Sequence, residues 1–449
     1  MPSDNKTVAV IGTGYVGVTT SAILANAGYK VYALDISEDR LNALRAGRSF
    51  FYEEGINPLI KKAVDDKNLI PTSSYKEAVS GSKFIFSCVG TPDKPDGSTN
   101  LDFVFAAAEE SAKYIRPGAI YIQKSTVPVG TGQKVAKVFG GKQIAYTSNP
   151  EFLREGTAVL DTLFFDRIVV GGADKNAVNE VLNLYKNIEK NQQEIAGLAG
   201  IKPKEIKGEY ISTNLDSAEL IKVTANAFLA LKISFANQIA QLSDKTDADI
   251  KEVTYAVGAD PRIGKAFLNA GRGYGGGCFP KDVSGLIKSA EDNGVDLTIM
   301  KSANELNEQM PGYIVNKAQK KIGALSNKKI AVLGLAFKAG TSDARKSPGI
   351  KIANLLAKAG AKVSAYDPEA NEEAGKDLDG SVKLFGSLEK AIAGTEAVFV
   401  ATDWDEFKKL DLAGLKSKMA GRLLVDCMNI YDSNEVKKAG LNYAGIGRS

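Results

Sequence analysis

The sequence predicts an α/β protein in which two Rossmann-like, doubly wound domains are joined by a long central helix and a helical region. Three observations lead to this prediction. A strand-turn-helix-strand pattern occupies residues 7–35, a weaker copy of it occupies residues 329–367, and a helical stretch lies between them at residues 217–242. With 449 residues, the chain is too long for a single ordinary core.

The first pattern begins with the β-branched run Thr7–Ile11, which breaks into Gly12-Thr13-Gly14-Tyr15-Val16-Gly17. A helical segment follows, and then a second strand, Lys30–Leu34, that ends at Asp35. Glycines at this spacing allow a tight turn and a close approach of a helix N-terminus to a pyrophosphate, while the acid accepts a hydrogen bond from a ribose 2′-hydroxyl. This context predicts a dinucleotide site that prefers NAD to NADP.

The helical stretch at residues 217–242 has apolar residues at helical spacing and contains no proline. It is longer than a typical globular helix, so we expect it to link the two α/β domains and to carry a dimer contact. The preceding segment, Lys190 to Asn214, shows no clear period and is expected to be a connection. The expected domains are residues 1–205, 206–322 and 323–449.

The second strand-helix-strand pattern, from Lys329 to Asp367, lacks the glycine triplet. Its loop carries Lys338 and is followed by Arg345, which places cations where a phosphate would sit. We favour a site for a phosphorylated ligand here over a domain that binds nothing.

Cys278 lies in a glycine-rich run at residues 271–282 and is followed by Lys281 and Asp282. Glycines permit close approach of the backbone to a ligand, and a nearby cation favours a thiolate. The other two cysteines, Cys88 and Cys427, lie in apolar segments typical of structural thiols. We interpret Cys278 as a reactive thiol; the alternative is a tight turn that carries a small residue.

The chain contains no histidine. Ser-His-Asp and Cys-His arrangements are therefore impossible, the usual zinc sites are excluded, and we expect no metal. Proton transfer must use Asp, Glu, Lys, Tyr, Thr with water, or the thiol.

Composition narrows the function classes further. The chain is 44% hydrophobic and 24% charged, and its net charge of +4 is not gathered into the basic stripe that nucleic acid requires. Three cysteines without paired spacing indicate a reducing compartment. With no signal-peptide character and no apolar run of membrane-spanning length, we expect a cytoplasmic protein with neither nucleic acid nor membrane as partner.

Five segments occur in the order found in UDP-glucose 6-dehydrogenases, and the chain resembles this family over almost its whole length. These segments are Gly12–Gly17, Lys124–Thr131, Asn149–Gly156, Lys222 with Asn226, and Gly275–Asp282. The resemblance implies NAD on the first domain and UDP-glucose as substrate. The implied reaction is a four-electron oxidation of the sugar C6 alcohol to a carboxylate, which yields UDP-glucuronate for polysaccharide biosynthesis and uses two NAD in turn.

The residue types suit that chemistry. A thiol at Cys278 can hold the aldehyde as a thiohemiacetal, which hydride loss converts to a thioester. Asp282 is the candidate to accept the alcohol proton through a water, which Lys222 and Thr126 help to hold. Lys222 can also stabilise the developing oxyanion charge. The resemblance points to Glu151 as the base for thioester hydrolysis. The implied catalytic set is Cys278, Lys222, Asp282, Glu151, Thr126 and Asn226.

The resemblance also implies ligand contacts. For NAD these are Gly12, Gly14, Tyr15, Val16, Gly17, Asp35, Arg40, Thr91, Thr126, Glu155, Lys281 and Arg345. For the nucleotide sugar they are Phe152, Leu153, Glu155, Lys222, Asn226, Phe267, Gly275, Phe337 and Lys338. Arg262 resembles the arginine that reaches a neighbouring subunit's site, which implies at least a homodimer.

Two positions depart from the family pattern. Gly277 stands where the family often has serine beside the nucleophile, and Met428 stands where it commonly has arginine. The Met428 departure puts part of the substrate anchoring in doubt.

Three alternatives stay open. The first is a sister enzyme acting on GDP-mannose or a UDP-N-acetylhexosamine, although the N-acetylhexosamine enzymes typically have histidine where this chain has Gly277, and Arg262–Leu268 favours UDP-glucose. The second is a two-electron dehydrogenase of a hydroxy acid with a structural Cys278. The third is a nucleotide-sugar sensor that has lost catalysis. The chain retains the residues that catalysis needs, which argues against this alternative: Cys278, Lys222, Asp282 and Glu151.

Overall fold

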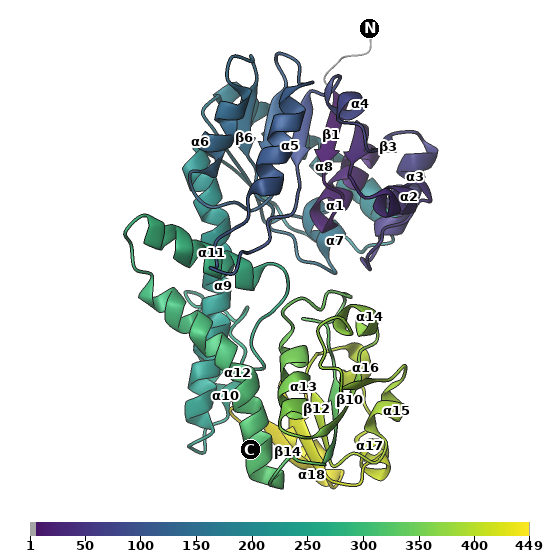
Figure 1. The fold of residues 1–449 in the computed structure, drawn as a ribbon, viewed down its shortest axis with the longest axis vertical. Coiled ribbons are helices and arrows are strands. Elements are labelled where there is room, and N and C mark those ends of the chain that lie inside the picture. Colours follow the sequence, from purple (N-terminus) through teal and green to yellow (C-terminus); the bar gives the residue numbers. More distant parts are fainter. Residues whose placement is uncertain (1–5, 449) are drawn as a thin grey trace. The chain divides into compact units, whose positions relative to one another are not determined.

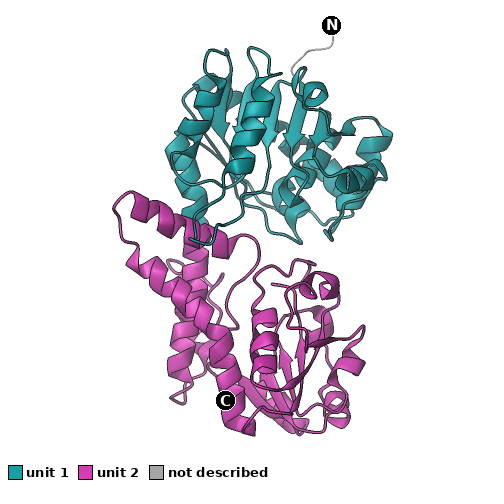
Figure 2. Ribbon diagram, in the orientation of Figure 1, with its two compact units in different colours: residues 1–225 teal, residues 226–449 magenta. Residues whose placement is uncertain are grey.

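The computed structural model describes residues 6–448 and divides into two compact units, residues 1–225 and 226–449 (Figure 2). The division falls inside helix α9 (Leu215–Ser243), so this helix contributes residues to both units. Each unit has its own sheet, dominated by parallel strands, with helices packed on it, which confirms the predicted fold class. Across residues 6–448, no helix combines the length and the apolar character needed to cross a membrane.

The sheet of unit 1 has eight strands in the order β3-β2-β1-β4-β5-β6-β7-β8 (Figure 1). All neighbours pair in parallel except β6 and β7. The first six strands follow the order that places a ligand at the carboxyl ends of β1 and β4. The strands are β1 (Thr7–Ile11), β2 (Lys30–Leu34), β3 (Leu69–Thr72), β4 (Phe84–Ser87), β5 (Ile120–Gln123), β6 (Ala145–Ser148), β7 (Arg167–Gly172) and β8 (Glu209–Thr213).

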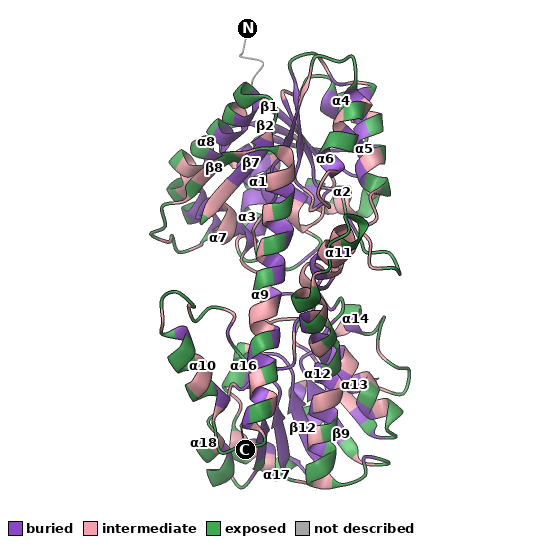
Figure 3. Cartoon of the chain, turned by 90° about the vertical axis from the view of Figure 1, so that its left-hand side faces the viewer, coloured by how far each residue is buried: buried purple, intermediate pink, exposed green. Residues whose placement is uncertain are grey.

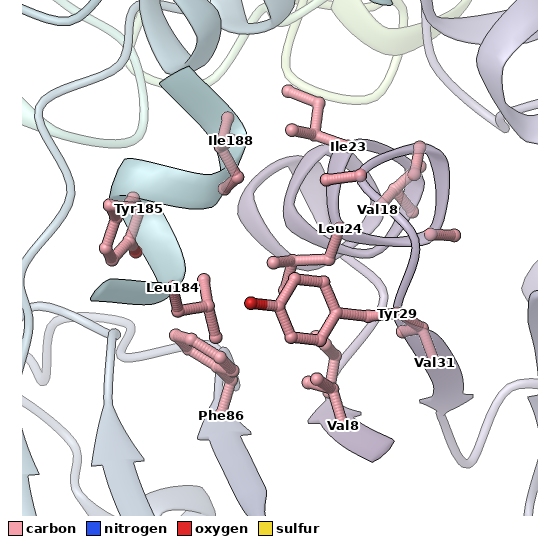
Figure 4. Packing of buried hydrophobic residues seen from close by; sticks show 14 of the residues in the cluster. Val8, Val18, Ile23, Leu24, Tyr29, Val31, Phe86, Leu184, Tyr185 and Ile188 are labelled. Atoms are coloured by element: carbon pink, nitrogen blue, oxygen red, sulfur yellow. The ribbon is translucent and has the colours of Figure 1, made fainter. Parts of the chain in front are cut away.

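The central strands β1, β4 and β5 of unit 1 are buried on both faces, as expected for a parallel sheet covered by helices. In β1, Val8 and Val10 pack into one apolar cluster, whereas Ala9 packs into the cluster on the other face. Figure 4 shows Val8 with Leu24 and Leu184 in the first cluster. The helices are α1 (Tyr15–Asn26), α2 (Glu38–Arg45), α3 (Ile56–Asp65), α4 (Tyr75–Val79), α5 (Asp102–Ala112), α6 (Thr131–Ala136), α7 (Ala158–Leu163) and α8 (Lys175–Ala199).

The expectation of a connection at residues 190–214 was wrong. Helix α8 continues to Ala199, and β8 adds a parallel edge strand beside β7. The helical period is not visible in the sequence here because every residue from Lys190 to Glu194 is polar. In the last turns of α8 the buried residues are Ile195, Ala196 and Ala199.

Unit 2 repeats the strand order of the first six strands, as β11-β10-β9-β12-β13-β14, with every pair parallel. The strand-helix-strand pattern predicted from Lys329 to Asp367 is confirmed as β9, α13 and β10. The strands are β9 (Lys329–Leu333), β10 (Lys362–Tyr366), β11 (Lys383–Leu384), β12 (Ala397–Val400), β13 (Leu423–Asp426) and β14 (Asn442–Gly445). The helices are α10 (Ile250–Gly258), α11 (Phe279–Asp292), α12 (Thr298–Ile322), α13 (Pro348–Lys358), α14 (Asn371–Ala374), α15 (Leu388–Ile392), α16 (Asp405–Lys408), α17 (Leu412–Lys418) and α18 (Ser433–Lys438).

Candidate active site

The turn between β1 and α1 has the shape that a pyrophosphate requires. Gly12 has a φ of 91°, and a Cβ there would lie 2.8 Å from the carbonyl oxygen of Cys88. A Cβ at Gly17 would lie 1.8 Å from the carbonyl oxygen of Gly12, whereas one at Gly14 would meet no atom within 4 Å. The turn is therefore packed closely at Gly12 and Gly17 and open at Gly14, where the first N–H groups of α1, from Tyr15 onward, are placed to receive phosphate oxygens.

Asp35 follows β2 and is buried. Its carboxylate accepts hydrogen bonds from the N–H and Oγ1 of Thr13, at 2.7 and 2.6 Å, and from the N–H of Ser37 at 2.9 Å. Arg40 lies 3.5 Å away. Burial alone would raise the pKa of Asp35, but the Thr13 and Ser37 hydrogen bonds together with Arg40 hold the pKa below its ordinary value. The carboxylate is thus ionised at neutral pH at the position of the predicted ribose contact.

The other cofactor residues predicted in unit 1 also follow strands at the carboxyl edge of the sheet. Thr91 comes after β4 and is buried, Thr126 comes after β5 and is half-buried, and Glu155 comes after β6 and is buried. With the turn after β1 and Asp35 after β2, five neighbouring strand ends therefore contribute to one edge, which is where this topology places its ligands.

A buried ion pair joins Glu151 and Lys222 in unit 1. The Lys222 Nζ lies 3.0 Å from Glu151 Oε1, and both side chains are at least nine-tenths buried. The second carboxylate oxygen accepts from the N–H of Leu153 at 2.8 Å. The Phe152 ring lies between two cations, with Lys222 Nζ at 5.4 Å and the Arg167 guanidinium at 4.0 Å from its centroid. The structure brings the predicted residues Glu151, Phe152 and Lys222 together, and Lys222 is not a solvated surface lysine.

The predicted thiol lies at the start of α11 in unit 2. Cys278 is the residue that caps this helix and is partly exposed, and its carbonyl accepts from the N–H of Asp282 one turn later. Asp282 is buried, and its two oxygens accept from Asn226 Nδ2 at 2.6 Å and from Lys281 Nζ at 2.5 Å. Lys281, predicted to contact cofactor, is therefore paired with Asp282 in this structure. The positive end of α11 is a favourable place for an anion at Cys278.

The glycines before Cys278 create space for two residues of the loop after β9. Gly276 has a φ of 84°, and a Cβ there would lie 2.7 Å from the Phe337 ring. A Cβ at Gly277 would lie 2.4 Å from the Arg345 guanidinium. The departure at Gly277 thus has a structural counterpart, because the guanidinium occupies the place of the absent side chain. Gly275, likewise, is packed against the backbone of Lys346.

The remaining residues predicted to contact the substrate lie in unit 2. Phe267 has a φ of 64°, a strained value for a residue with a side chain. Lys338 Nζ lies 5.6 Å from the centroid of the Phe337 ring. Arg262 is 87% exposed and pairs with Asp260 of its own loop at 2.6 Å.

The second Rossmann-like domain uses its acid differently from the first. Asp367 follows β10 as Asp35 follows β2, but it accepts from the N–H groups of Leu335 and Ala336 and from Trp404 Nε1. Its side chain is 1% exposed. The carboxylate holds the loop after β9 in place and is not presented to a ribose.

Cys88 and Cys427 are structural thiols, as predicted. Each directly follows a buried strand and is itself buried. Burial raises the pKa of Cys88 to about 12 and raises that of Cys427 as well. Met428 comes next and is partly buried, and its N–H donates to Asp426.

Sequence reasoning gave no role to several buried charged residues, among them Lys124 and Glu219. Lys124 Nζ donates to the Tyr185 hydroxyl at 2.9 Å, and that hydroxyl donates to Asn149 Oδ1 at 2.5 Å. Lys124, Tyr185 and Glu151 all line a cavity of about 60 Å³. Glu219, which lies in α9, is described below. Neither residue gives a signal in the sequence, because only the fold brings Tyr185 to Lys124 and the partners of Glu219 are backbone N–H groups.

Comparisons with known proteins agree with this geometry. Three family models match successive parts of the chain: the NAD binding domain of the UDP-glucose/GDP-mannose dehydrogenase family at residues 6–189, its central domain at 216–309 and its UDP binding domain at 331–433. The protein is thus an NAD-dependent oxidoreductase. The chain belongs to the UDP-glucose/GDP-mannose dehydrogenase family.

Individual relatives extend over the whole chain. UDP-glucose 6-dehydrogenase YwqF of Bacillus subtilis is 38% identical over 98% of this chain and 97% of its own length. Among solved structures, a UDP-glucose dehydrogenase from Pyrobaculum islandicum is 35% identical with a TM-score of 0.89, covering 100% of this chain and 99% of that one. A UDP-D-ManNAc dehydrogenase from Pyrococcus horikoshii is 28% identical with a TM-score of 0.85, over 98% and 99%.

Asp35 gives a testable prediction about cofactor choice. The carboxylate repels the 2′-phosphate of NADP, and Asp35→Ser removes that charge and leaves Arg40 without its partner at 3.5 Å. We expect the ratio of kcat/KM for NADP to that for NAD to rise about tenfold or more, since like-charge contacts cost several kcal/mol. Steady-state kinetics with both cofactors measure it, with the exposed Asp39→Ser as control. An unchanged ratio in Asp35→Ser would contradict this role.

Proposed function

We propose that the chain oxidises the C6 alcohol of UDP-glucose to the carboxylate of UDP-glucuronate with two NAD, through a covalent intermediate on Cys278. One observation carries the proposal. Cys278 is the partly exposed thiol, placed at a helix start with the buried Asp282 one turn away, whereas Cys88 and Cys427 are buried. NAD, when bound, supplies the hydride acceptor for both oxidations.

The first step removes a proton and a hydride from the C6 alcohol and leaves an aldehyde. In this proposal Asp282 takes the proton through a water, and its fixed hydrogen bonds to Asn226 and Lys281 support that assignment. Lys222 stabilises the developing oxyanion, for which its burial in a low-dielectric environment is favourable. Thr126 helps to hold the water.

The second oxidation requires that the aldehyde stay bound. The Cys278 sulfur adds to the aldehyde carbon to form a thiohemiacetal, and loss of the second hydride and a proton gives a thioester. Water then attacks the thioester, with Glu151 as base, and the C–S bond breaks to release the acid and regenerate the thiol. The pairing of Glu151 with Lys222 supports this assignment because it orients the carboxylate.

We propose that the active form is at least a homodimer. Apolar side chains of α9 recur on its exposed side at intervals of seven or eight residues, at Leu220, Phe228, Phe235 and Leu242. Figure 3 shows green and pink residues running along α9. A second copy of the chain is the partner that such a repeating apolar face suits. Arg262, exposed in its loop, is available to a neighbouring subunit. The catalytic thiol further supports a reducing compartment, the cytoplasm.

The proposed reaction predicts two NADH for each UDP-glucose consumed, with UDP-glucuronate as product. Absorbance at the NADH band, combined with product identification by mass spectrometry, measures this ratio. GDP-mannose, UDP-galactose and UDP-N-acetylglucosamine serve as comparison substrates. Formation of one NADH per substrate would refute the four-electron assignment. A higher kcat/KM for one of the comparison substrates would identify that compound, and not UDP-glucose, as the preferred substrate.

A further inference from the structure

Glu219 connects α9 to the segment that follows β5. Its Oε2 accepts from the N–H of Gly130 at 2.8 Å, and its Oε1 accepts from the N–H of Gly132 at 2.7 Å. The side chain is 2% exposed. Both oxygens of this buried carboxylate therefore accept hydrogen bonds from backbone N–H groups, which lie nearly ninety residues before Glu219 in the chain.

The contact between Glu219 and the two glycines lies close in the chain to two residues that have roles in the proposed reaction, Thr126 and Lys222. Thr126 precedes Gly130 by four residues, and Lys222 follows Glu219 by three, which is one helical turn along α9. The packing is close, because a Cβ at Gly132 would lie 2.9 Å from Glu219 Oε1 and 3.0 Å from the Tyr146 ring. Any movement of the carboxylate is thus transmitted directly to the segment that carries Thr126.

We propose that Glu219 is a positioning residue, whose ionised carboxylate holds the Thr126 segment against α9 and whose protonation weakens that hold and lowers activity. The proposal rests on the proposed function for the roles of Thr126 and Lys222. It concerns a residue that touches neither substrate nor cofactor in the reaction described above.

The surroundings of Glu219 make this carboxyl titrate near neutrality. Burial raises its pKa, the hydrogen bonds from Gly132 and Gly130 lower it, and the charge of Asp216 raises it, giving a pKa of about 7. Tyr146 of β6 lies beside it, with Tyr121 of β5 stacked behind at 5.9 Å.

Two lysines lie on the elements that this contact joins. Lys222, one turn later on α9, is paired with Glu151, and Lys134, the charged residue of α6, is exposed. Burial remains the largest influence on the pKa of the Glu219 carboxyl.

The direction of the pH effect follows from the hydrogen bonds. An ionised carboxylate accepts on both oxygens, whereas a protonated one turns one oxygen into a donor and loses an acceptor. Below the pKa, one of the two backbone N–H groups therefore loses its charged partner. Activity should therefore increase as the pH is raised through about 7. In other proteins a histidine commonly titrates in this pH range, and in this chain, which has no histidine, the Glu219 carboxyl takes that part.

The substitution Glu219→Gln tests this, because glutamine keeps the shape of the protonated acid and does not titrate. We expect kcat/KM of the variant to be within twofold of wild type at pH 6 and about tenfold lower at pH 8.5, since a hydrogen bond to a charged group is lost only where wild type is ionised. The rise of activity through pH 7 should disappear. A rise that persists in Glu219→Gln, or a loss that is equal at all pH values, would overturn the proposal.

The control is Asp216→Asn, which removes the same charge from the same helix at a solvent-exposed contact with Gln133. It should retain the rise, with a slightly lower midpoint because Asp216 raises the pKa of Glu219. In wild type, amide hydrogen exchange of residues 128–136, corrected for intrinsic rates, should show less protection at pH 6 than at pH 8. This measurement needs no variant to fold, and equal protection at both pH values would also overturn the proposal. The NADH stoichiometry of wild type tests the proposed function separately.

Discussion

Replacing Cys278 with serine should reduce formation of the acid by at least about 1,000-fold, because a hydroxyl at this position cannot supply a thiolate nucleophile or a thioester. The loop around Cys278 is fixed by close backbone packing of Gly275, Gly276 and Gly277, so the isosteric change leaves the fold intact. Binding of NAD and of the nucleotide sugar should stay near wild-type affinity. Product formation by mass spectrometry and binding by calorimetry measure the two effects.

The matched control is Cys88→Ala, which removes a buried thiol that follows β4. It should lower the free energy of unfolding modestly and leave acid formation near the wild-type rate. If Cys278→Ser still produced the acid at a rate close to wild type, the covalent role of Cys278 would be refuted. The alternative of a two-electron dehydrogenase with a structural Cys278 would then be favoured.

Lys222→Met should lower both activity and stability. The ion pair with Glu151 is buried on both sides, and removing one member leaves an uncompensated carboxylate in a low-dielectric environment. We expect a loss of about 3 kcal/mol in the free energy of unfolding. The loss of oxyanion stabilisation should lower kcat by about 100-fold or more. Urea unfolding and steady-state kinetics provide both values, with the exposed Lys190→Met as control.

The double variant Lys222→Met/Glu151→Gln separates these two effects. Because the second change neutralises the stranded carboxylate, most of the lost stability should return. Activity should not return, since neither the cation nor the base is present. Recovery of activity in the double variant would mean that Lys222 acts only by balancing the charge of Glu151.

The sequence predicted the parts of the fold that depend on local pattern. Hydrophobic periodicity and glycine spacing were sufficient to predict the turn after β1, the strand ends at Asp35 and Asp367, and helix α9. The α8–β8 region was not, because its last helical turns are polar and its strand is only partly buried at the sheet edge.

The candidate site was predicted unevenly, for a physical reason. Cys278 and Lys222 are conspicuous in a sequence because a thiol among glycines and a lysine in an apolar helix break the local pattern. Glu219 sits in the same helix as Lys222, but its partners are backbone N–H groups, which leave no trace in residue identity. Lys124 is similar, since only the fold brings Tyr185 to it.

The closeness of Gly277 to Arg345 makes a change at one of these positions depend on the residue at the other. A serine introduced first at position 277 would place its Cβ against the guanidinium, which would then have to leave Asp343, with which it pairs at 2.6 Å. A shorter residue introduced first at position 345 removes the obstacle, after which serine at 277 is accommodated without conflict. The two positions are therefore coupled: a side chain at 277 and the guanidinium at 345 compete for the same space, and serine at 277 requires the flexible arginine to adopt another position.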